Sequence, residues 1–120
     1  MSTFKYLNLD YLNLMADGDD DMKATMIEML VDELPEEMDK MKAAHEVEDW
    51  IELREVSHKM KSTLAFVGND AMTEANKEVE DIAKNGGDNA VKLPELLGIL
   101  FDIYPKALEE LKTVLSSIEV

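Results

Sequence analysis

The sequence predicts an all-α protein, an antiparallel up-down-up-down four-helix bundle with a short additional helix at its N-terminal end. Between the glycines and prolines, apolar residues recur at spacings of three and four, the period of an amphipathic helix. Strand-like alternation is confined to residues 4–9. The four long periodic segments have short connections, which favours antiparallel packing of neighbouring helices. With 120 residues, the chain has the size of a single domain, residues 1–120.

The first two helices are expected at about residues 8–15 and 20–44. Gly18 separates them, and the aspartates that follow it cap the free N–H groups of the second helix and face the positive end of its dipole. Pro35 predicts a kink inside this helix. We interpret the methionines of its apolar stripe as core filling. The stripe consists of Met22, Met26, Met29 or Leu30, Leu34, Met38 and Met41.

Three further helices are expected: one at about residues 47–67, one that ends at Asn85-Gly86-Gly87, and one at about residues 93–117. Gly68 ends the first of them, and Asn69 or Asp70 caps the next. Pro94 suits a first helical turn, whereas Pro105 predicts a second kink. The expected core positions are Leu53, Val56, Met60, Leu64 and Val67; Ala71 or Met72, Ala75, Val79 and Ile82; then Leu96, Leu97, Leu100, Tyr104, Leu108, Leu111, Leu115 and Ile118.

Composition excludes several classes of function. The formal net charge is −15, so phosphate backbones and anionic lipids repel the chain, which argues against nucleic-acid and membrane-surface roles. The chain has no cysteine for a disulfide or zinc-thiolate site, no apolar stretch long enough to span a membrane, and no signal-peptide pattern after Met1. We expect a cytoplasmic monomer, and Met1 favours a free-standing protein.

His58 is the candidate for chemistry. On a helical wheel it lies nearly opposite the apolar stripe of its helix, so we expect an exposed imidazole. Around it, Arg54, Lys59 and Lys61 outnumber Glu55 by two charges, although the chain as a whole is acidic. This surplus indicates an anion site, and a neutral imidazole can accept a phosphoryl group. The alternative is an ordinary surface histidine.

Two neighbours of His58 suit a phosphoryl acceptor. Lys61, at i+3, is placed to offset the negative charge of a phosphoryl group. Ser62, at i+4, is small and leaves the imidazole open to a partner. Glu55, at i−3, could orient the ring, but we favour a plain surface acid.

These residues form a pattern that resembles a known family. His58-x-x-Lys61-Ser62, with Asp49-Trp50 before it and Gly68 after it, is similar to the H-x-x-K-G motif of histidine-containing phosphotransfer (HPt) domains. The resemblance covers essentially the whole chain and departs from the motif at Ser62. It implies that His58 accepts a phosphoryl group from a receiver-domain aspartate and passes it to another receiver. Lys61 would stabilise the charge, Ser62 would allow access and Gly68 would be structural.

The resemblance also implies what the chain binds. Receiver domains are the expected partners, and they supply the acidic pocket and magnesium, so no cofactor or metal is expected here. We expect the docking surface to include Ile51, Arg54, Glu55, Lys59, Ala65 and Phe66.

Other functions were weighed against this one. No glycine-rich phosphate loop is present, and we expect a phosphocarrier rather than an enzyme. Two alternatives remain: a helical scaffold in which His58 is incidental, and the phosphoryl-accepting domain of a chemotaxis-type kinase labelled in trans. Asp17, Asp19, Asp21 and Glu28 match calcium-loop positions, but Met22 replaces the glycine that such a loop needs.

Overall fold

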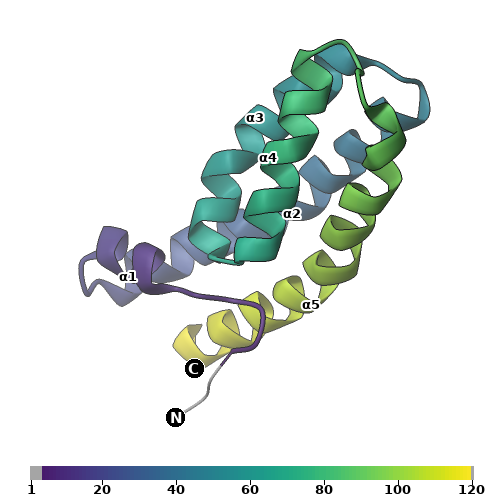
Figure 1. Cartoon of the computed structure of the whole chain (residues 1–120). Coiled ribbons are helices and arrows are strands. Elements are labelled where there is room, and N and C mark those ends of the chain that lie inside the picture. Colours follow the sequence, from purple (N-terminus) through teal and green to yellow (C-terminus); the bar gives the residue numbers. More distant parts are fainter. Residues whose placement is uncertain (1–3, 120) are drawn as a thin grey trace.

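The computed structural model describes residues 4–119, and within this range it contains helices and connecting segments but no strand (Figure 1). It therefore confirms the all-α class and the short first helix. None of the described helices is long and apolar enough to cross a membrane. The helices are α1 (Asp10–Ala16), α2 (Asp20–Glu46), α3 (Trp50–Val67), α4 (Asp70–Lys84), a 3₁₀ turn (Ala90–Lys92) and α5 (Leu93–Glu119).

The four long helices pack in a ring. Helix α3 packs on α2 and α4, while α5 packs on α4 and returns to contact α2. Helix α1 packs on α2 and α3, and Figure 1 shows it at one end of the bundle, beside the start of α2. The bundle is elongated, with extents of 46 × 21 × 20 Å.

Side-chain caps define where the helices begin, because the first N–H groups of a helix have no partner inside it. The Asp19 carboxylate accepts hydrogen bonds from the backbone N–H groups of Asp21 and Met22 at the start of α2. Asp49 caps α3, which starts three residues later than predicted, at Trp50. Asn69, and not Asp70, caps α4. The aspartates near residue 19 thus have a capping role.

The prolines lie inside their helices. Helices α2 and α5 continue through Pro35 and Pro105, respectively, and Figure 1 shows α5 curving along its length.

The core confirms most of the predicted stripes. All five predicted positions of α3 are buried, and in α4 Met72 is buried while Ala71 is exposed. The interpretation of the methionine stripe was wrong for Met22, which lies in the first turn of α2 and is 49% exposed. At the position predicted as Met29 or Leu30, Leu30 is buried and Met29 is 52% exposed.

In the second half of α5 the structure confirms the predicted core position Leu111, which is fully buried. At the two neighbouring positions the buried residue is the one before the predicted one: Ala107 and Val114 are buried, whereas Leu108 and Leu115 are only partly buried.

Candidate functional site on the α3–α4 face

His58 lies on the outer face of α3, and its side chain is 72% exposed. Its Nδ1 atom is 2.7 Å from Oε2 of Glu80, a residue of α4 whose side chain is only 11% exposed. The other carboxylate oxygen of Glu80 is 2.5 Å from Nζ of Lys61. Glu80 therefore joins the candidate histidine and the candidate lysine through its two oxygens.

The charge of Glu80 determines which way the hydrogen bond to His58 runs. The hydrogen bond from Lys61 lowers the pKa of Glu80, burial opposes that change, and the hydrogen bond with His58 adds to the lowering. A charged carboxylate can only accept hydrogen bonds, so His58 donates its Nδ1–H to Glu80. In the neutral ring, Nε2 is then the nitrogen with a free lone pair.

A buried hydrogen-bond cluster holds the two helices in register beside this contact. Ser57 Oγ lies 2.7 Å from Asn76 Oδ1, and Asn76 Nδ2 donates to the Ser57 carbonyl oxygen at 2.9 Å. Both residues are fully or almost fully buried. Glu80 follows Asn76 by one helical turn, and His58 follows Ser57 directly. The cluster therefore sets the position from which Glu80 reaches the imidazole.

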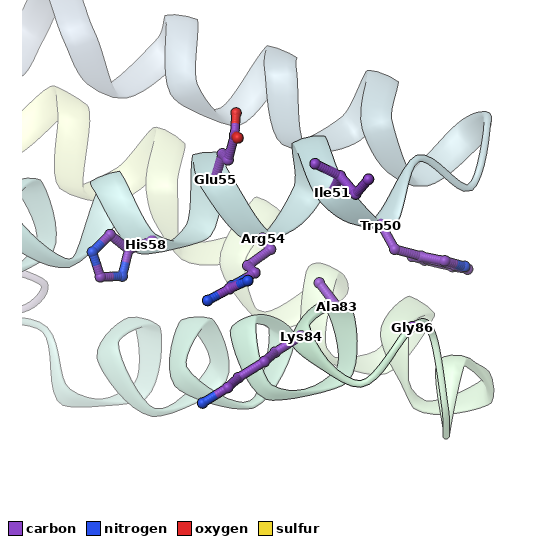
Figure 2. A pocket seen from close by; sticks show the side chains of 8 residues that line it. All are labelled: Trp50, Ile51, Arg54, Glu55, His58, Ala83, Lys84 and Gly86. Carbon is purple, nitrogen blue, oxygen red and sulfur yellow. The ribbon is translucent and has the colours of Figure 1, made fainter.

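A groove between α3 and α4 begins at His58 and has a volume of about 560 Å³. Arg54 of α3 and Lys84 of α4 both line it, and Figure 2 shows the Arg54 guanidinium directed toward α4 and the Lys84 side chain lying along α4. Trp50 and Ile51 line its far end. Glu55 also lines this groove, although its carboxylate points away from α4, and it lines a separate hollow with residues of α2.

A comparison with known protein families found a match for most of the chain. The Hpt domain family model matches residues 25–119, from within α2 to the end of α5. The chain belongs to the Hpt domain family. Hpt domains are phosphocarriers of two-component phosphorelays, not kinases, and they interact with receiver domains. Searches of curated proteins and of solved structures found no significant match.

In this Hpt domain the small residue of the motif, Ser62, is exposed and lies beside a second, apolar hollow between α2 and α3. Met26, Met29 and Phe66 line that hollow, and the Phe66 ring stacks on Tyr11 with centroids 5.2 Å apart.

The residues expected to dock a partner are spread over three hollows. Ile51, Arg54 and Glu55 line the α3–α4 groove, whereas Phe66 lines the apolar hollow. Glu55 also lines a third hollow, toward α2, together with Lys59. Ala65 is exposed on α3.

Gly68, which follows the motif residues, caps α3 with a φ of 73°, a backbone conformation that residues with side chains rarely adopt. A Cβ atom here would meet the Asn8 carbonyl oxygen, because the N-terminal segment packs directly on this turn. The Asn8 N–H donates to the Val67 carbonyl oxygen at 3.0 Å. The glycine thus permits both the turn and the close approach of the N-terminal segment.

Glu80 and Lys84 were missed by the sequence analysis, which had considered only acids and bases of the His58 helix. Glu55, the acid weighed there as a partner of the ring, has no hydrogen bond with His58. The sequence contained only an indirect indication that Glu80 is largely buried. Glu80 directly follows Val79, a predicted core position, so its side chain starts at the edge of the buried stripe of α4.

Proposed function

We propose that His58 is the phosphoryl acceptor of this Hpt domain, taking the group from an aspartyl phosphate of one receiver domain and giving it to another. The observation that carries the proposal is the exposed imidazole whose Nδ1–H is bound to a largely buried carboxylate. The orientation leaves Nε2 as the nucleophile.

In the proposed transfer, the Nε2 lone pair attacks phosphorus and the bond to the aspartate oxygen breaks, releasing the receiver's carboxylate. A P–N bond forms, and the ring, which keeps its Nδ1 proton, acquires positive charge. The Glu80 carboxylate offsets this charge at 2.7 Å. Attack by an aspartate of the second receiver reverses the same changes. Magnesium bound by the receiver would stabilise the phosphoryl group in both steps, so this chain needs no cofactor of its own.

Lys61 and Ser62 have supporting roles in this proposal. The Lys61 ammonium, held beside the imidazole by Glu80, supplies positive charge near the phosphoryl group. Ser62 is exposed and small, so it leaves room for the receiver next to the ring. Its hydroxyl is the departure from the usual glycine.

We also propose that the long helices run up, down, up and down. The two-residue connection between α3 and α4 supports this direction. Contacts between these helices support it too: Trp50 meets Gly87, and further along α3 His58 meets Glu80. A monomer in the cytoplasm, without kinase activity, fits the proposed role.

Replacing the two histidines one at a time tests the assignment, because the chain contains only two. We expect His58→Gln to abolish acid-labile phosphate after incubation with phosphorylated receivers, while the helical circular dichroism stays unchanged. His45→Gln, the matched control near the end of α2, should be labelled like the unmodified protein.

Undiminished labelling of His58→Gln would contradict the assignment and favour the scaffold alternative. Labelling of His58 from ATP by a kinase catalytic domain, but not by any receiver, would favour the chemotaxis-type alternative.

A further inference from the structure

The α3–α4 groove holds two cations that no ion pair neutralises. Lys61 is engaged by Glu80, and Lys40 and Lys106 pair with acids of their own helices. Among the described residues, Arg54 and Lys84 have no acidic partner within ion-pair distance, a property they share with lysines outside the groove such as Lys92 and Lys112. Both side chains line the groove together with one acid, Glu55, whose carboxylate points away from α4 in Figure 2. The charged side chains of the lining are therefore two cations and one acid, on a chain with a net charge of −15.

The two cations lie beside the reacting group without being part of it. Arg54 precedes His58 by four residues on α3, and Lys84 follows Glu80 by four residues on α4, a separation of about 6 Å along each helix. At this separation they lie next to the imidazole on the side of the groove, whereas Lys61 lies with Glu80. They are placed to contact whatever molecule covers His58.

We propose that the α3–α4 groove binds the acidic rim of the receiver's phosphoaspartate site and so orients the receiver on His58. This inference rests on the proposed function. The reacting aspartyl phosphate is an anion, and the side chains that hold its magnesium must be mainly carboxylates, the ligands that this cation prefers. A surface of that charge is repelled by most of this chain and attracted by this groove.

The rest of the groove suits a protein surface. Ile51 is 76% exposed at the groove, and the partly buried indole of Trp50 lies at the far end. Aromatic and arginine side chains are the types that contribute most to protein interfaces. Because the groove has both an apolar end and a cationic end, we expect its ligand to be a folded acidic surface rather than a free phosphate ion.

Exposed charges at an interface act mainly on encounter. They change the association rate and its salt dependence, because attraction operates over a Debye length before contact forms. The groove should therefore govern the second-order rate constant of transfer, whereas the chemical step within the bound complex depends on His58, Glu80 and Lys61.

The test compares the double variant Arg54→Glu/Lys84→Glu with Lys112→Glu/Lys92→Glu, two exposed lysines outside the groove lining that give the same change in net charge. The probe is a receiver that labels His58, phosphorylated on its aspartate. At low ionic strength we expect the groove variant to lose about tenfold or more in second-order rate constant. The maximal rate at saturating receiver and the lifetime of phosphohistidine should stay within about twofold of the unmodified protein.

A second measurement detects binding separately from chemistry. Trp50 is the single tryptophan, so in ¹⁵N-labelled protein its indole N–H gives one resonance that an unlabelled receiver should shift on titration. The shift should persist in His58→Gln and weaken in the groove variant.

An equal loss of rate in both double variants would overturn the inference, because it would show an effect of net charge alone. A groove variant with an unchanged second-order rate constant would overturn it as well. A shortened phosphohistidine lifetime with normal association would also do so, since it would place these cations at the phosphoryl group. If no receiver labels His58 in the unmodified protein, the proposed function fails instead.

Discussion

At the scale of single residues, the reactivity of His58 depends on a residue of another helix. An exposed imidazole alone can carry its proton on either nitrogen. Glu80 removes this ambiguity, because its lowered pKa keeps it a carboxylate that only accepts hydrogen bonds. The Glu80 carboxylate is charged at any pH above its ordinary pKa, and it loses this charge only when the pH falls through its lowered pKa. The site therefore keeps its acceptor at neutral pH.

Glu80→Gln tests this positioning role. Glutamine retains an oxygen that can accept the Nδ1–H bond but lacks the charge that favours it, so we expect a smaller fraction of the Nδ1–H tautomer and roughly tenfold slower transfer, the loss of about 1.4 kcal/mol. The ¹⁵N chemical shifts of the His58 ring report the tautomer directly. Asp81→Asn, an exposed neighbour, is the control. An unchanged tautomer ratio would show that Glu80 is structural only.

At the scale of elements, the contact between α2 and α3 contains a buried acid. Glu37 is 5% exposed; one of its oxygens accepts a hydrogen bond from Thr63 Oγ1 at 2.7 Å, and the other has no partner. Burial raises the pKa of Glu37, and Glu33 adds to this rise, whereas the Thr63 bond and two lysines oppose it. The buried carboxyl of Glu37 destabilises the folded protein least when it is protonated. Its destabilising contribution to the free energy of unfolding thus grows as the pH rises from the ordinary pKa toward the raised pKa.

Glu37→Gln removes this cost without removing the acceptor for Thr63. We expect the free energy of unfolding at pH 7 to increase by about 1 kcal/mol, and the increase to shrink toward pH 4, where the native carboxyl is already neutral. Urea unfolding at several pH values measures the difference. Glu36→Gln, an exposed neighbour, should show no comparable increase. A gain that does not vary with pH would contradict the explanation.

The turn between α3 and α4 provides a second test at this scale. Gly68 and Gly18 both have a positive φ, 73° and 78°, but only a Cβ on Gly68 would collide with other atoms. We expect Gly18→Ala to cost about 1 kcal/mol of stability and Gly68→Ala clearly more, because the Asn8 backbone must also shift. Thermal unfolding of the two variants compares them. Equal losses would mean that the contact with Asn8 contributes nothing.

Short-range patterns could be predicted from the sequence, whereas contacts between residues far apart along the chain could not. The α3 stripe and the caps at Asp19 and Asn69 are local patterns, and the structure confirms them. The pairing of His58 with Glu80 spans 22 residues and depends on a helix register that no local pattern encodes. The exposed Met29 shows the same limit, since Leu30 beside it fits the period equally well.

At the scale of the whole molecule, negative charge is concentrated on one segment. Residues 17–39 contain ten acids and a single cation, Lys23. The acidic side chains of α2 and of the residues just before it therefore repel one another, whereas the α3–α4 groove carries the cations Arg54 and Lys84. Self-repulsion destabilises a compact state, and it is screened as the Debye length falls from about 30 Å at 0.01 M salt to about 8 Å at 0.15 M.

Salt should therefore act in opposite directions on folding and on transfer. We expect the thermal midpoint to rise between 0.01 and 0.15 M NaCl, because repulsion along α2 weakens, while the second-order rate of transfer from a receiver falls, because attraction to the groove weakens. Calorimetry and rapid-mixing transfer assays at matched salt concentrations measure the two trends. Arg54→Glu/Lys84→Glu should keep the rise in midpoint and lose the fall in rate. A midpoint that decreases with salt would show that attractive pairs, such as Lys61 with Glu80, outweigh the repulsion of α2 in the folded protein.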